Sequence, residues 1–150
     1  MKTLLAFALS AVLTGTSFAG DHSTIVLSKV FAEATPDTRE MILKSDSSSE
    51  TLHVDRNAAL DDKDIAETAL IEGGQAVGVR ITLTQEGKRK FAELTKESIG
   101  KRVAIIVKDQ VISAPHVIAE ITGGSMDIAG AFTKESAEKI VQEIQQAKNG

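Results

Sequence analysis

The chain has 150 residues, of which 25% are charged, with a net charge of −4 and no cysteine, tryptophan or tyrosine. The lack of cysteine excludes disulfides, thiolate metal sites and cysteine nucleophiles, and the scarcity of aromatic side chains argues against stacking on nucleic acid. A chain of this length can bury roughly two-thirds of its unfolded surface, so we expect one domain held by an ordinary apolar core.

The first residues have the layout of a secretory signal peptide. A basic residue, Lys2, precedes a short apolar run, and the small-x-small ending Ser17-Phe18-Ala19 follows. The apolar run is too short to anchor the mature chain, and no later stretch approaches 18 consecutive apolar residues. We therefore predict a signal peptide over 1–19 and a single domain over 20–150, periplasmic or secreted, with no transmembrane segment after cleavage.

The first part of that domain has three strand patterns. Residues 24–31 are apolar and β-branched without helical spacing, which predicts a strand. Residues 41–44 and 52–54 are shorter candidates, separated by a polar, serine-rich stretch that favours a turn. We expect these two to form a hairpin.

A short helix is expected next, over 61–72. The acids of Asp61-Asp62-Lys63-Asp64 would lie in its first turn, where the helix dipole favours them. Apolar residues follow at helix-like spacing, and Gly73-Gly74 would end the helix.

The second half gives clearer patterns. Strict alternation over 77–83 predicts a strand with one buried face. Thr84 is placed to cap a helix over 85–97. The uninterrupted apolar run 103–107 is typical of a strand covered on both faces.

The last third continues with strands and a final helix. We expect a strand over 111–113, an interruption at Pro115, a further strand over 117–121, and a glycine-rich loop over 123–127. Thr133 then precedes a helix with an apolar stripe. Together the elements predict an α+β fold: a mostly antiparallel or mixed sheet with two to three helices packed on one face.

The sequence gives little evidence for a catalytic or metal site. His53 and Asp55 lie two apart on a strand and would share a face, but they lack the further ligands of a useful metal site. Ser113 and His116 could be a nucleophile and base, yet Pro115 intervenes and no oxyanion-loop signature is adjacent. We therefore expect no enzyme and no cofactor.

One metal-binding alternative depends on cleavage after Ala19. The mature chain would then begin Gly20-Asp21-His22, which offers an amine, two deprotonatable amides and an imidazole as a square-planar nitrogen set. This set suits Cu(II) or Ni(II), so a periplasmic copper- or nickel-binding protein is the alternative interpretation.

From residue 52 onward the chain resembles a known family. The resemblance is carried by five segments in order: 79–87 with Phe91 and 94–95, 99–106, 111–115, 121–124 and 128–133. Together they are similar to the head subdomain of the first periplasmic domain of SecD, in the SecDF protein-export family, and the likeness is strongest over 52–145. In that family the subdomain is a noncatalytic module that contacts exported polypeptide.

The resemblance implies a stand-alone exported module that binds polypeptide or an envelope protein, including components of the Sec translocon. With no transmembrane helices expected, it would not itself couple ion flow to export. A sheet edge and a glycine loop could each add a partner strand, because both expose backbone groups. The expected partner-binding residues are Ser113, Ala114, Pro115, His116, Gly123, Gly124, Ser125 and Met126.

Overall fold

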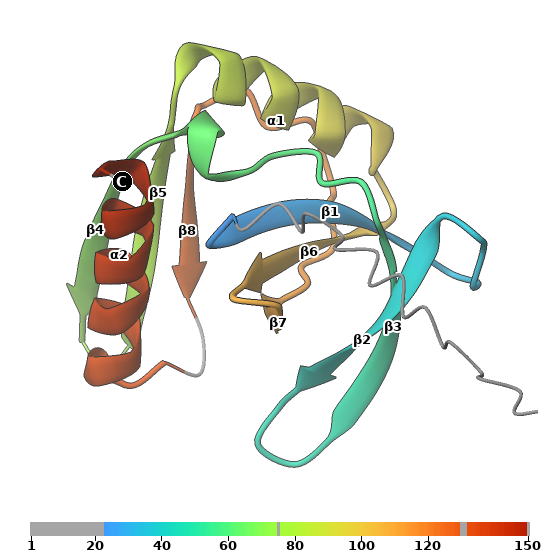
Figure 1. The fold of residues 1–150 in the computed structure, drawn as a ribbon, viewed down its shortest axis with the longest axis horizontal. Coiled ribbons are helices and arrows are strands. Elements are labelled where there is room, and N and C mark those ends of the chain that lie inside the picture. Colours follow the sequence, from blue (N-terminus) through green and yellow to red (C-terminus); the bar gives the residue numbers. More distant parts are fainter. Residues whose placement is uncertain (1–22, 75, 130–131, 150) are drawn as a thin grey trace, which may run out of the picture.

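The computed structural model describes residues 23–74, 76–129 and 132–149, which form a five-stranded barrel beside a three-stranded sheet (Figure 1). The barrel, in spatial order β1-β3-β2-β7-β6, consists of β1 (Ile25–Phe31), β2 (Thr38–Lys44), β3 (Ser49–Asp55), β6 (Arg102–Val107) and β7 (Gln110–Ser113). The sheet consists of β4 (Ile65–Gly73), β5 (Ala76–Leu83) and β8 (Ser125–Ala129), in the order β4-β5-β8. The helical elements are η1 (Asp62–Asp64), a 3-10 turn, and the α-helices α1 (Gln85–Glu97) and α2 (Lys134–Asn149).

Strand β6 lies between two apolar cores, as its unbroken apolar sequence predicts. Ala104 and Ile106 belong to the core that includes the barrel residues Leu52 and Val54. Val103, Ile105 and Val107 belong to the larger core, which the barrel shares with the sheet and both helices. Because successive side chains of a strand point to opposite faces, this one strand joins the two cores.

Both α-helices begin where the sequence predicts. The Thr84 hydroxyl accepts a hydrogen bond from the Gly87 amide at 3.0 Å, and the Thr133 hydroxyl accepts one from the Ser136 amide at 3.1 Å. Such bonds satisfy amides that have no partner inside the helix. Helix α2 packs against β4 and β5, whereas α1 lies across the end of the sheet (Figure 1).

The helix expected over 61–72 is wrong beyond its first turn. Residues 62–64 form the 3-10 turn η1, and the chain then runs as β4, paired with β5 from Ile65 to Gly73. The acids do cap this turn, since the Asp61 side chain accepts from the Lys63 amide. The long ladder with β5 outweighs the weak local helix preference of the following residues.

The strand expected over 117–121 is also wrong. Val117 makes a single isolated bridge to Ile99, while Ile118 is 90% exposed, so the apolar alternation there does not mark a strand. The strand β8 lies instead over 125–129 and begins within the expected loop over 123–127, because those residues pair with β5. The α+β class with mixed and antiparallel pairing is confirmed, but the strands divide between a barrel and a sheet.

Candidate functional site

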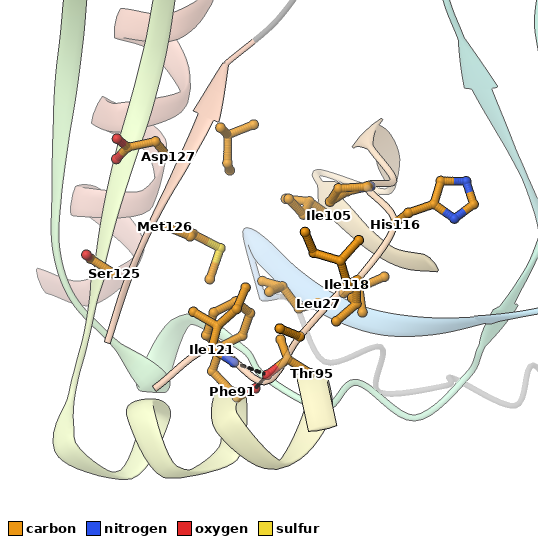
Figure 2. A pocket seen from close by; sticks show the side chains of 15 residues that line it. Leu27, Phe91, Thr95, Ile105, His116, Ile118, Ile121, Ser125, Met126 and Asp127 are labelled. Atoms are coloured by element: carbon orange, nitrogen blue, oxygen red, sulfur yellow. Dashed lines mark hydrogen bonds between the residues drawn. The ribbon is translucent and has the colours of Figure 1, made fainter. Parts of the chain in front are cut away.

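An apolar cavity of about 460 Å³ lies between β8, the outer face of the barrel and α1 (Figure 2). Leu27 and Ile105 line it from the barrel, Phe91 from α1, and Met126 and Ile128 from β8. Its lining is predominantly hydrophobic, as in most ligand-binding pockets. The cavity is therefore suited to apolar side chains rather than to charged groups.

An irregular segment, residues 118–121, forms the cavity wall opposite β8 (Figure 2). Ile118 is 90% exposed and Ile121 is 41% exposed, although both line the cavity. The Ile121 amide donates a 2.9 Å hydrogen bond to the hydroxyl of Thr95, a buried residue of α1. Large apolar side chains are thus held at the mouth of the cavity, where water contacts them.

Strand β8 is an edge strand in the described part of the chain, with β5 on one side only. The Leu83 amide donates to the Gly124 carbonyl at 2.8 Å, which makes 83 and 124 a hydrogen-bonded pair. Since such pairs alternate along an antiparallel ladder, Met126 and Ile128 turn their backbone groups toward β5. Ser125, Asp127 and Ala129 therefore direct theirs to the free edge, beside the cavity.

The opposite edge of the sheet, on β4, is partly covered near its start. Lys148 of α2 donates to the Ala66 carbonyl, and the Gln145 side chain donates to the Thr68 carbonyl at 3.3 Å. Covering an edge with a helix blocks pairing with another chain. The edge of β8 is consequently the better available place for strand addition.

Four of the eight expected partner-binding residues line this cavity: Pro115, His116, Ser125 and Met126. The other four, Ser113, Ala114, Gly123 and Gly124, lie nearby in sequence but outside its lining.

The expected edge at 113–116 has some of its backbone already engaged. The Ala114 carbonyl accepts from the Arg102 side chain at 2.8 Å, and the Pro115 carbonyl accepts from the Val103 amide at 3.1 Å. A partner strand at these groups would have to replace bonds within the chain. Among the described residues, no such bond engages the outward backbone groups of β8.

Several lining residues were missed from sequence, among them Phe91, Thr95, Ile118 and Ile121. Phe91 and Thr95 lie on the buried side of α1, where sequence reasoning assigns them simply to the core. The exposed isoleucines gave a usable signal, because two large apolar residues lie just before a glycine pair.

A charge pair joins β8 to β5: Asp127 belongs to the cavity lining, but its carboxylate points away from the cavity centre (Figure 2). Arg80 donates two hydrogen bonds of 2.7 Å to the carboxylate of Asp127. These bonds hold the pKa of Asp127 below its usual value and raise the pKa of Arg80. The pair fixes β8 to β5 on the exposed face and leaves the cavity apolar.

The described residues do not assemble the metal or catalytic groups considered from sequence. No group of three or more histidine, aspartate or glutamate side chains within them could hold a metal ion. Within the same ranges, no hydrogen bond joins Ser113 to His116, and the imidazole of His116 points away from the cavity centre (Figure 2). Gly20, Asp21 and His22, the alternative copper or nickel site, lie outside the described residues.

The fold and cavity define an α+β domain with an apolar groove beside an open strand edge. The family model of the SecDF P1 head subdomain matches residues 39–147, and the chain belongs to this family. Across the described ranges, no helix is both long and apolar enough to cross a membrane.

Proteins of similar sequence are protein translocase subunits. SecD of Acidaminococcus fermentans is 34% identical over 86 residues, which cover 56% of this chain and 20% of that protein. SecDF of Thermus thermophilus is 44% identical over 62 residues, which cover 41% of this chain and 8% of that protein. The chain thus spans a fifth or less of the length of these relatives.

Solved structures show the same fold. SecDF in its super-membrane-facing form gives a TM-score of 0.66 at 23% identity, covering 84% of this chain and 19% of that one. A structure described as a membrane component SecDF that enhances protein export gives 0.64 at 23% identity, covering 84% of this chain and 63% of that one.

Proposed function

We propose that this chain is an exported, noncatalytic module that binds extended polypeptide at the cavity beside β8. The observation that carries the proposal is an apolar cavity next to a strand edge whose outward backbone groups lack a partner strand among the described residues. Membership of the SecDF head family supports a role related to Sec protein export.

Strand addition suits a binder of many sequences. Main-chain hydrogen bonds form with any extended segment, while alternate side chains enter pockets. Here the bonds would come from Ser125, Asp127 and Ala129, and apolar side chains of the partner would enter beside Met126. The partner is therefore an unfolded polypeptide or an exposed strand of an envelope protein, including components of the Sec translocon.

The proposed location follows from the leader-like residues 1–19. Cleavage after Ala19 would release residues 20–150 into the periplasm or the medium. Pro115, His116, Ser125 and Met126 are the proposed contact residues, together with Ile118 and Ile121 at the cavity mouth.

Asp127 offers a matched pair of variants that tests edge pairing. Asp127→Pro removes an outward amide without removing a bond to β5, and proline is tolerated on edge strands. Asp127→Ala also loses the ion pair with Arg80 but keeps the backbone N–H of residue 127. For a fluorescein-labelled peptide of alternating valine and threonine flanked by lysines, we expect the proline variant to bind about 10-fold more weakly, because the complex loses one main-chain hydrogen bond and leaves a carbonyl of the peptide without a donor.

Fluorescence anisotropy gives the affinities, and far-UV circular dichroism verifies that both variants fold. The alanine variant should bind as the wild type does. If all three proteins bound the peptide with equal affinity, the peptide would not pair with the edge of β8. If the wild type did not bind the peptide, the proposal itself would be wrong.

Photocrosslinking from Ser125 in cells then identifies the natural partner, with Glu138 on the exposed side of α2 as the control position. Adducts to many unrelated exported chains or to Sec components, obtained from Ser125 alone, are the expected result. A single recurrent envelope protein would instead indicate a dedicated partner, and equal adducts from both positions would contradict a site at β8.

A further inference from the structure

Residues 118–123, here called the strap, are attached to the described chain at few points. Before the strap, the Val117 amide donates to Lys101 and its carbonyl accepts from Gly100, both at 2.8 Å. After it, the Gly124 carbonyl accepts from the Leu83 amide at 2.8 Å. Between these anchors, one hydrogen bond ties the strap backbone to the rest of the described residues: the Ile121 amide to the Thr95 hydroxyl, at 2.9 Å.

Thr95 can make this bond without giving up another. Its side chain is buried, with 1% of the residue exposed, and its hydroxyl lies 2.9 Å from the Phe91 carbonyl and 3.1 Å from the Ala92 carbonyl. The single hydroxyl proton goes to a carbonyl of its own helix, as is common for helical threonine. The oxygen lone pairs then remain to accept from Ile121. The bond is therefore an addition that stabilises the strap and not the helix.

The position of the strap determines the width of the cavity. Ile118 and Ile121 line one wall, and Met126 of β8 lies across from them (Figure 2). Thr95 itself lines the cavity between these walls. A strap released from α1 would move its isoleucines relative to β8 and change the space open to a side chain of the partner.

We propose that Thr95 is a positioning residue that holds the strap against α1 and thereby sets the width and apolar lining of the polypeptide site. Its effect on binding rests on the function proposed above, whereas its effect on the strap does not.

Two substitutions separate the hydroxyl from the packing. Thr95→Val keeps the shape and removes the hydrogen bond, whereas Thr95→Ser keeps the hydroxyl and removes a methyl group. Hydrogen exchange at the Ile121 amide, followed by NMR, should become at least 10-fold faster in the valine variant and stay near the wild-type rate in the serine variant. Amides of β5 serve as the reference, because a general loss of stability would accelerate them as well.

The peptide affinity provides the second measurement. Affinity for the valine–threonine peptide should change at least fivefold in Thr95→Val and less than twofold in Thr95→Ser. Unchanged exchange at Ile121 in the valine variant would overturn the inference, and so would equal acceleration in both variants, since packing would then be responsible. If the wild type binds no peptide while Ile121 exchange responds as expected, the proposed function fails and the positioning of the strap stands.

Discussion

Asp64 connects the 3-10 turn η1 to helix α1 through its backbone and its side chain. Its carboxylate, in a residue 3% exposed, accepts from the Lys90 ammonium at 2.9 Å, and this hydrogen bond raises the pKa of Lys90. Its carbonyl accepts from the Thr84 amide at 2.8 Å, just before α1. Gly87, in the first turn of α1, lies directly against that carbonyl. A glycine within a helix thus exists here because α1 approaches the 3-10 turn closely.

Gly87→Ala tests this contact and should reverse the usual effect of such a change. An alanine normally stabilises a helix by about 1 kcal/mol relative to glycine. Here the added methyl carbon would overlap the Asp64 carbonyl oxygen, so the backbone of η1 or of α1 must move. We expect a loss of about 2–4 kcal/mol in the free energy of unfolding, in the range of overpacked cores or above it.

Urea denaturation followed by circular dichroism measures the loss. Gly123→Ala is the control, because nothing lies within 4 Å of the position that its added methyl carbon would take, and the residue is exposed. A Gly87 variant as stable as the wild type would mean that α1 does not need the close approach to Asp64.

At the scale of elements, strands with a strong pattern were predictable and their partners were not. Alternation located the strand that became β5, and an unbroken apolar run located β6. The closure of the barrel joins β2 to β7 through Leu43 and Val111, which lie far apart in sequence, and local patterns carry no information on such a pairing. Strand β4 was mistaken for a helix for the same reason, because its ladder with β5 decides its structure.

The candidate site was predictable in part. Ser125 and Met126 were expected as contacts, and they line the cavity although their strand was expected as a loop. The remaining walls come from segments as distant as Leu27 and Phe91, which only the tertiary fold brings together.

The part of the β4 edge that α2 contacts gives a prediction at this scale. In the double variant Gln145→Ala with Lys148→Ala, the Ala66 and Thr68 carbonyls lose their partners from α2. Alanine preserves the helix, so the edge is exposed without unfolding α2. We expect stronger concentration-dependent self-association than the wild type shows, because a second open edge can then pair with another chain.

Sedimentation velocity over a range of protein concentrations measures this association. The double variant Glu138→Ala with Lys139→Ala, on exposed positions of the same helix, is the control and should sediment as the wild type does. If the Gln145 and Lys148 double variant sedimented as the wild type does at every concentration, side chains of α2 would not be what protects β4.

For the molecule as a whole, the barrel and the sheet share one core, and this has consequences for both folding and binding. The outer face of the barrel contributes Leu27 and Ile105 to the core that also contains Val79 of β5 and Ile144 of α2. The barrel therefore does not bury its surface independently of the sheet. The cavity lies at this junction, so a change in the contact between barrel and sheet also changes the cavity.

Substitutions at two neighbouring residues of β6 distinguish the effect on folding from the effect on binding. Ile105 faces the shared core and lines the cavity, whereas Ile106 faces the barrel interior. Either isoleucine replaced by alanine should cost about 2–5 kcal/mol of the free energy of unfolding. Because both cores contain β6, we expect one calorimetric transition in each variant, shifted to lower temperature.

Binding distinguishes the two variants. Ile105→Ala enlarges the cavity and should change the affinity for the valine–threonine peptide, while Ile106→Ala should leave it unchanged at a temperature where both are folded. Two separate transitions would contradict the shared core, since barrel and sheet would then unfold independently. If both variants unfold in one step and bind the peptide with equal affinity, the polypeptide does not bind at the junction between barrel and sheet. Of the two isoleucines, Ile105 is the one that lines the cavity where a side chain of the partner would lie.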